Sequence, residues 1–197
     1  GQVGGSSEGA PASASEWQPS MTRDGANKWA ADSVEQRVMY HNTHTELADD
    51  IIKDGFVFPD FSGAYGAGVY MAVRPENGFG DHTLELKLNI KKPLEYSEQL
   101  VHDSVQWEKD TKQPLMSFSK RFSAYARAMG YDAIHISREY LQRAAPGPIK
   151  REWYVVLDQK SITVISRGPK TSYPPVERSD ESLAEGGAGS GNFDHAG

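Results

Sequence analysis

Residues 37–55, RVMYHNTHTELADDIIKDG, predict a strand that leads almost directly into a helix. The strand covers residues 37–41. Thr43 stands three residues before Glu46, which is the spacing of a capping box at the N-terminus of a helix. An apolar face follows at helical spacing, and Gly55 is typical of a helix end. This stretch therefore predicts a strand, a two-residue turn and a helix.

Five further strands are predicted outward from this stretch, at residues 68–72, 83–90, 132–137, 152–157 and 162–166. The second of them, TLELKLNI, alternates strictly between apolar and polar residues, which predicts a half-buried strand that Pro93 stops. A strong helical pattern covers residues 117–129 and ends at Gly130, and a weaker one covers residues 98–110. Six strands with two or three helices and no internal repeat predict an α+β fold.

The two ends of the 197-residue chain differ in composition from its centre. Residues 1–20 contain 14 Gly, Ser, Ala or Pro, and residues 179–197 contain 11 Gly, Ser or Ala. Such segments bury too little apolar surface to offset the entropy of ordering them. We therefore expect one domain over residues 31–168, a flexible linker over residues 1–30 and a flexible tail over residues 169–197.

Composition excludes several classes of function. The net charge of −6 and the lack of a Lys/Arg cluster disfavour direct binding to nucleic acid or to an anionic membrane. The absence of cysteine excludes thiol nucleophiles and Cys-based zinc sites. No apolar run is long enough for a membrane span, and no secretion signal is present, so a cytoplasmic location is expected.

Common catalytic motifs are also missing. There is no phosphate-binding loop of the GxxxxGK[ST] type and no GxSxG elbow. Gly66-Ala67-Gly68 lacks the third glycine of a dinucleotide fingerprint and precedes a strand, although glycines at positions 63, 66 and 68 let the backbone turn sharply or approach a ligand closely. His41 and His44 have no third ligand nearby, so no metal site is expected.

What remains is a polar residue on each of three predicted strands: His41, Tyr70 and Glu152. Each has an ordinary structural explanation, because a histidine at a strand end is usually hydrogen-bonded, a strand tyrosine is usually core, and a glutamate that opens a strand is usually solvated. The alternation of a strand places Glu152 on the same face as Tyr154 and Val156, opposite the apolar residues between them.

Five motifs along residues 36–168 together resemble, in order, those of the ADP-ribosyltransferase superfamily. They are YHNT at 40–43, GAGVYMA at 66–72, LELKLNIKKPL at 84–94, GYDAI at 130–134, and EWYVVLD at 152–158 with Ile162 after it. The resemblance implies an α+β fold of two packed, mostly antiparallel sheets with a few short helices. It is closest to the His-Tyr-Glu branch of diphtheria toxin and the poly(ADP-ribose) polymerases, and within it to domains of phage polyvalent proteins.

The other, Arg-Ser-Glu branch fits less well. His41 stands where that branch has its arginine, and Lys150 stands where its ExE turn needs an acidic or amide residue.

The resemblance implies roles for residues that match the motifs. His41 would hydrogen-bond the adenosine ribose of NAD⁺, and the main chain of Asn42 would hold the nicotinamide amide. Thr43 would be a further contact of NAD⁺. Tyr70 would stack on the nicotinamide ring, and Glu152 would bind a hydroxyl of the nicotinamide ribose. His41, Tyr70 and Glu152 would be the catalytic residues, and no metal would be needed.

Two aromatic residues extend this set. The branch has a second tyrosine about eleven residues after the first, and Asp81 stands there instead. Phe79 either substitutes for that tyrosine or anchors a loop. Tyr65 either contacts NAD⁺ or the acceptor, or has a structural role.

The activity that the resemblance implies is mono-ADP-ribosyl transfer, a pentosyl (glycosyl) transfer from NAD⁺ to a macromolecular acceptor, expected to be a protein. Breaking the nicotinamide–ribose bond develops positive charge on the sugar, which a nearby carboxylate stabilises. The protein would act as a toxin-like phage or mobile-element effector in the host bacterial cell, delivered there with a virion. An NAD⁺ glycohydrolase and a catalytically silent virion or binding module stay open as alternatives. An RNA 2′-phosphotransferase is disfavoured by the acidic net charge.

The glycine-rich ends carry a second resemblance. GSGNFDHAG at residues 189–197 and GQVGGS at residues 1–6 are similar to the two halves of a boundary found in phage polyproteins. The chain would then be a segment of a larger polyprotein, released by cleavage within such boundaries. The alternative is that both ends are plain flexible linkers.

Overall fold

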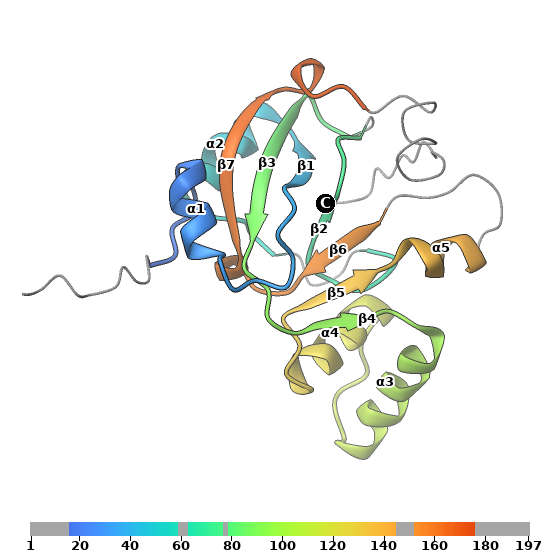
Figure 1. Cartoon of the computed structure of the whole chain (residues 1–197). Coiled ribbons are helices and arrows are strands. Elements are labelled where there is room, and N and C mark those ends of the chain that lie inside the picture. The colour runs from blue at the N-terminus through green and yellow to red at the C-terminus, as the bar shows by residue number, and fades with distance from the viewer. Residues whose placement is uncertain (1–15, 59–62, 77–78, 145–151, 176–197) are drawn as a thin grey trace, which may run out of the picture.

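The computed structural model describes residues 16–58, 63–76, 79–144 and 152–175. Its centre is one seven-stranded sheet with the order β4-β5-β6-β2-β1-β3-β7 (Figure 1). All neighbouring pairs are antiparallel except β4 and β5. The strands are β1 Met39–Thr43, β2 Val69–Ala72, β3 His82–Leu88, β4 Pro93–Glu95, β5 Ala133–Ile136, β6 Trp153–Val156 and β7 Ile162–Pro169. The predicted α+β class is confirmed.

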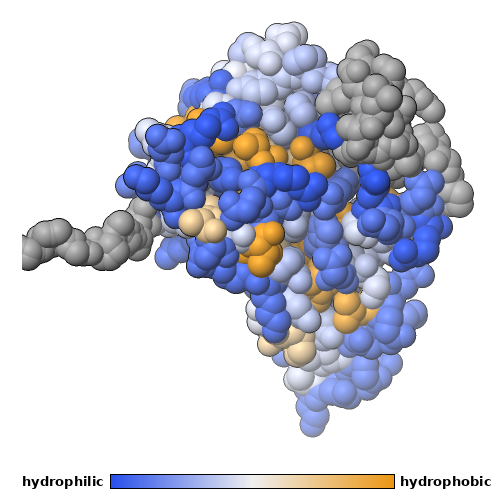
Figure 2. Space-filling view, in the orientation of Figure 1, coloured by the Kyte–Doolittle hydropathy of each residue, from blue (hydrophilic) through white to orange (hydrophobic). Residues whose placement is uncertain are grey.

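The α-helices divide between the two halves of this sheet. In Figure 1, α1 and α2 lie beside β7, β3 and β1, whereas α3, α4 and α5 lie near β4 and β5. The α-helices are α1 Arg23–Trp29, α2 Thr45–Asp54, α3 Glu98–Asp110, α4 Phe118–Ala128 and α5 Arg138–Ala144, and two short 3-10 helices are Gln159–Ser161 and Lys170–Ser172. Figure 2 shows that α1 and α3 present hydrophilic surfaces, while the apolar side chains visible on this face lie mostly between the helices.

The sheet buries apolar residues on both faces, in two separate clusters. On the face that α2 covers, here called the α2 face, Ala48 and Ile51 pack against strand residues that include Met39 and Met71. On the opposite, α4 face, Phe122 packs in the cluster that contains Tyr70 and Val155. Successive strand residues point to opposite faces, so β2 sends Met71 to one cluster and Tyr70 to the other.

The expected arrangement of two packed sheets is wrong. β1 and β2 pair at Tyr40 and Ala72, and this short ladder joins the β7-β3-β1 half to the β2-β6-β5-β4 half in one continuous sheet. β2 and β6 pair over four residues, so the connection between the halves is much narrower than the ladders inside them.

The capping box predicted at the start of α2 is also wrong. Thr43 is the last residue of β1, and α2 begins at Thr45 after His44, whose side chain makes no cap hydrogen bond. Instead, the carboxylate of Asp81 accepts a hydrogen bond from the backbone N–H of Thr45 at 3.1 Å. A tertiary contact therefore replaces the local cap, while the helix ends at Gly55 as predicted.

Folded structure extends beyond the predicted domain limits. The expected linker over residues 1–30 contains α1, and the indole N–H of Trp17 donates to the carbonyl of Ile162 at 2.8 Å. Residues 169–175, which were expected in the tail, include a short 3-10 helix. Lys150, residues 59–62 and the glycine-rich ends lie outside the described residues.

The strand predicted as half-buried is buried on both faces. β3 lies between β1 and β7, and Lys87 on its polar side is only 4% exposed. Its ammonium group donates a hydrogen bond to the carbonyl of Gln36 at 2.5 Å. The alternation of apolar and polar residues correctly predicted a strand here, but it could not predict that the strand lies inside the sheet.

Two glycines with positive φ provide a matched test of backbone packing. Gly80 (φ 78) lies against the backbone of Thr43, whereas Gly130 (φ 88) faces open space except for the end of Lys92. Both alanine variants strain φ, but only Gly80→Ala also drives a Cβ into a backbone. We expect Gly80→Ala to lower the free energy of unfolding by about 3 kcal/mol and Gly130→Ala by about 1 kcal/mol. Urea denaturation checks this, and equal losses would contradict the predicted contact.

Candidate active site

The three predicted catalytic residues come from neighbouring strands at the centre of the sheet. His41 is on β1, Tyr70 is on β2, and Glu152 directly precedes β6. His41 pairs with Leu84 of the α2 face, and Glu152 is two residues from Tyr154 on that same face. From the register and ordinary strand dimensions, the Cα atoms of His41 and Glu152 are about 12 Å apart. The side chain of Glu152 contacts His135, which is in register with Tyr154, so Glu152 lies on the predicted face.

Tyr70 does not join the other two residues. Its ring is 2% exposed and lies in the cluster on the α4 face. Its hydroxyl donates to the carbonyl of Gly66 at 2.6 Å and accepts from the backbone N–H of Tyr65 at 2.8 Å, and burial raises the pKa of Tyr70. The stacking role expected for this ring is not compatible with its position, because the alternation of β2 turns it away from His41.

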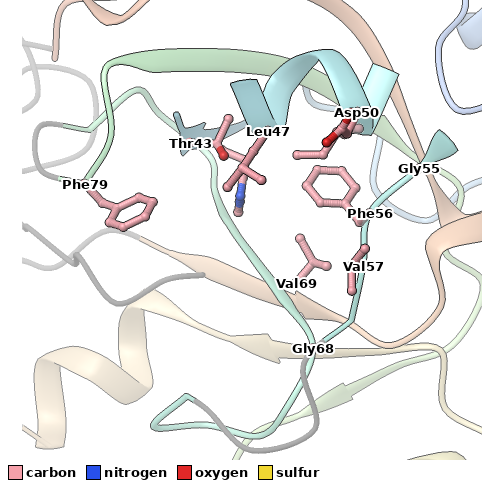
Figure 3. Close-up of a pocket in the computed structure, with 11 residues that line it drawn as sticks. Thr43, Leu47, Asp50, Gly55, Phe56, Val57, Gly68, Val69 and Phe79 are labelled. Carbon is pink, nitrogen blue, oxygen red and sulfur yellow. The ribbon is translucent and has the colours of Figure 1, made fainter. Parts of the chain in front are cut away.

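A pocket of about 210 Å³ lies between α2 and the ends of β1 and β2 (Figure 3). His41 and Thr43 line it, as does Asp50, and the other described side chains that line it are apolar: Leu47, Ile51, Phe56, Val57, Val69 and Phe79. Figure 3 shows the rings of Phe56 and Phe79 on opposite sides of this space. Neither Tyr70 nor Glu152 lines the pocket.

His41 is neutral in this setting. Burial lowers the pKa of His41 below its usual range. Its Nδ1 lies 2.7 Å from the backbone oxygen of Tyr70, which can only accept a hydrogen bond. Nδ1 therefore carries the proton, and Nε2 is left as an acceptor for a hydroxyl group. The ring of Phe56 contacts the imidazole edge to face, with ring centres 5.1 Å apart.

The other predicted binding residues divide between the two faces. The Asn42 side chain points away from His41, because its amide donates to the carbonyl of Glu76 and accepts from the hydroxyl of Thr83, both at 2.8 Å. Phe79 is 41% exposed and belongs to the pocket. Tyr65 packs against Tyr96 beside the α4-face cluster, which favours its structural role.

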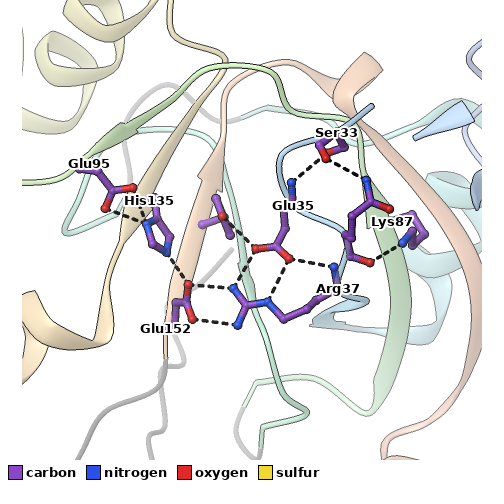
Figure 4. A network of polar contacts seen from close by, with 9 residues as sticks. Ser33, Glu35, Arg37, Lys87, Glu95, His135 and Glu152 are labelled. Carbon is purple, nitrogen blue, oxygen red and sulfur yellow. Dashed lines mark hydrogen bonds and ion pairs between the residues drawn. The ribbon is translucent and has the colours of Figure 1, made fainter. Parts of the chain in front are cut away.

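Glu152 lies at the centre of a polar network outside the pocket (Figure 4). Arg37 donates to both of its carboxylate oxygens, at 3.0 Å to Oε1 and 2.9 Å to Oε2. Nε2 of His135 lies 2.5 Å from Oε2. Burial by itself would raise the pKa of Glu152, but the hydrogen bonds from His135 and Arg37 lower it to about 2. The carboxylate is therefore ionised over the physiological pH range.

Four members of this network, His135, Glu95, Arg37 and Glu35, were not predicted from the sequence. His135 contacts Glu95 through Nδ1 at 2.7 Å, and Arg37 also bonds Glu35 at 2.8 Å. His135 had a sequence signal, because it is the lone ionisable residue within the apolar run AIHI at 133–136. Arg37, Glu35 and Glu95 had none. Arg37 contacts Glu152 only in the folded protein, and Glu35 and Glu95 join the network through Arg37 and His135.

This arrangement combines a neutral histidine beside an apolar pocket with an ionised carboxylate on the same face of the sheet. Within the described ranges, no group of three or more His, Asp or Glu side chains could hold a metal ion. None of the helices in the described part of the chain is long and apolar enough to span a membrane. No protein-family model matches the chain, and no curated protein matches it either.

Proposed function

We propose that the protein is an NAD⁺-dependent mono-ADP-ribosyltransferase, which breaks the nicotinamide–ribose bond and transfers ADP-ribose to a macromolecular acceptor, a protein. One observation carries the proposal: His41 and Glu152, which are 111 positions apart in the sequence, lie on the same face of the sheet with only β2 between their strands. These are the two residues to which the motif resemblance assigns the sugar contacts of NAD⁺.

The pocket beside His41 has the chemistry needed for one heteroaromatic ring of NAD⁺. Phe56 and Phe79 offer aromatic surfaces, and Asp50 offers a carboxylate that can accept a hydrogen bond from an exocyclic amino group. Nε2 of His41, which makes no hydrogen bond to the described residues, can accept one from a ribose hydroxyl beside that ring. A pocket of about 210 Å³ encloses only part of the dinucleotide, so the rest must lie along the protein surface.

Glu152 supplies the charge that the reaction needs. As nicotinamide leaves with the electron pair of the bond to C1′, positive charge develops on the ribose, and a fixed carboxylate stabilises that charge more than it stabilises the substrate. A carboxylate offers about four lone-pair positions. Among the described residues, Arg37 and His135 occupy two positions on Oε2 and one on Oε1, which leaves Oε1 able to accept a ribose hydroxyl. The acceptor's nucleophilic atom then bonds C1′ and releases its proton to solvent.

A catalytically silent module of the same fold is the second candidate, and two observations favour it. The ring of Tyr70 is buried on the opposite face, and Glu152 is absent from the lining of the pocket. Such a module would keep the fold and the network around Glu152 without turning over NAD⁺.

An assay with NAD⁺ labelled in its adenylate group tests the proposal, because the label follows ADP-ribose while nicotinamide release is measured separately. The protein is incubated with a bacterial lysate, and both nicotinamide release and labelled macromolecule are measured. We expect Glu152→Gln to lower both by roughly 100-fold or more, because it removes the negative charge and keeps the shape of the side chain. Glu46→Gln, on the exposed side of α2, is the matched control and should behave as wild type.

The possible outcomes separate the candidate functions. Label on macromolecules that depends on Glu152 supports the transferase. Free ADP-ribose without labelled macromolecule indicates a glycohydrolase instead. If the folded wild-type protein releases no nicotinamide, the transferase proposal is wrong and the silent module is favoured.

A further inference from the structure

His135 sits between two carboxylates supplied by the strands on either side of it. β5 pairs with β4 on one side, where His135 is in register with Glu95, and with β6 on the other, where it is in register with Tyr154. Nδ1 lies 2.8 and 2.7 Å from the two oxygens of Glu95, and Nε2 lies 2.5 Å from Oε2 of Glu152. The His135 side chain is only 14% exposed.

These contacts require both ring nitrogens of His135 to carry protons. An ionised carboxylate can only accept hydrogen bonds, and a neutral imidazole has a single N–H to donate. Burial lowers the pKa of His135, but the hydrogen bonds to Glu152 and Glu95 outweigh burial and raise the pKa above its usual value. With both nitrogens protonated, His135 is a half-buried cation between two carboxylates.

The groups around His135 are of both signs. Glu95 faces it from β4, Glu152 from the position just before β6, and the ring of Tyr154 from β6 itself, with the His135 and Tyr154 ring centres 4.7 Å apart. Arg37, which precedes β1, approaches Glu152 from the other side. Glu152 is therefore held between two cations, and Figure 4 shows this row of alternating charges.

We infer that His135, held between Glu95 and Glu152, is a positioning residue that fixes the carboxylate of Glu152 for the reaction. The inference rests on the proposed function and goes beyond it, because the motif resemblance assigns no role to His135. The His135 contact at Oε2 limits rotation of the carboxylate, so that Oε1 is presented in one orientation. When His135 loses its proton, one of its two carboxylate contacts must be lost, and the hold on Glu152 weakens.

The alkaline side of the pH profile distinguishes positioning from a merely structural bridge. Because the pKa of His135 is raised in the folded protein, its ion pairs are complete below its usual pKa and are lost as the pH rises through the raised value. The rate of nicotinamide release by the wild type should therefore fall in a single step as the pH rises through the raised pKa of His135. His135→Gln keeps an N–H donor but cannot titrate, so it should lose this step and lower kcat roughly 10- to 100-fold with little change in KM.

Glu95→Gln tests the same inference without touching either His135 or Glu152. It removes one anion from His135, so the alkaline step should move to lower pH. His102→Gln, on the exposed side of α3, is the control for replacing a histidine and should leave the profile unchanged. Circular dichroism shows whether each variant is folded.

NMR titration of the His135 imidazole gives a readout that does not depend on turnover. We expect the His135 pKa to be above 6.5 in the wild type and to fall in both Glu95→Gln and Glu152→Gln. An ordinary His135 pKa in all three proteins would overturn the inference. It would also be overturned if the wild type is active and His135→Gln has the same kcat and pH profile. If the wild type is inactive while the His135 pKa is raised as expected, the proposed function fails and His135 is a structural bridge.

Discussion

Tyr70→Ala is expected to lower the free energy of unfolding by about 4 kcal/mol, which is enough to leave much of a marginally stable domain unfolded. The ring is almost wholly buried on the α4 face, so its removal leaves a cavity. The same change also removes the hydroxyl that joins the carbonyl of Gly66 to the N–H of Tyr65. Urea denaturation followed by tryptophan fluorescence measures the loss.

Two further variants separate the contributions of the ring and of its position. Tyr70→Phe keeps the ring and leaves the two backbone groups without the hydroxyl, so a loss of about 1–2 kcal/mol is expected. Phe79→Ala removes a half-exposed pocket ring, so it should cost less than about 1 kcal/mol and weaken ligand binding instead. If Tyr70→Ala were as stable as wild type and raised only the KM for NAD⁺, Tyr70 would be a binding residue as the resemblance implied.

Glu35→Gln is expected to lower the free energy of unfolding by about 3 kcal/mol at neutral pH. Glu35 is 5% exposed and its carboxylate accepts four hydrogen bonds: from the backbone N–H, Nε and Nη2 of Arg37 at 2.8, 2.9 and 2.8 Å, and from the hydroxyl of Tyr154 at 3.0 Å. An amide of the same shape would turn an NH₂ group toward these donors. It would also remove one of the two carboxylates that neutralise Arg37.

The cost of Glu35→Gln should depend on pH. Burial raises the pKa of Glu35, but the hydrogen bonds from Arg37 outweigh this and hold the pKa below its usual 4.5. A carboxylate with a lowered pKa contributes stability that is present above the usual value and is lost as the pH falls through the lowered one. The difference in unfolding free energy between wild type and Glu35→Gln should therefore shrink as the pH is lowered below 4.5.

Urea denaturation at pH 7 and pH 3 checks this expectation, and Glu46→Gln is the exposed control. If the difference in unfolding free energy between wild type and Glu35→Gln is the same at both pH values, the charge of Glu35 is not what stabilises the network. A difference under about 0.5 kcal/mol at pH 7 would show that the network contributes little to stability.

Much of the sheet was predictable because strand signals are local. The sequence pattern predicted the limits of β3, β5, β6 and β7 to within a few residues. It also predicted α3 at its observed bounds, Glu98–Asp110. The alternation of strand residues correctly turned Glu152 away from Trp153 and Val155. The missed elements are short, and α1 is held by N-terminal contacts to β7, which no local pattern reports.

The candidate site was predictable only in part. The sequence indicated His41 and Glu152, and the fold brings their strands close together, but it also indicated Tyr70, whose ring the structure buries. Resemblance of motifs identifies positions along a chain, whereas the direction of a side chain depends on the register between strands. Arg37 and His135 could not be ranked from the sequence, because their importance comes from contacts with Glu152 across 115 and 17 positions.

By itself, the sequence determined the α+β class, most of the strands, and the face of its strand on which Glu152 lies, because all of these follow from local periodicity. Only the tertiary structure decided that the strands form one continuous sheet and that Asp81 rather than Thr43 caps α2. It also decided that Glu152 is held ionised between Arg37 and His135. These features depend on pairing between distant segments, and hydrogen bonds and ion pairs form only where the fold brings donors and acceptors together.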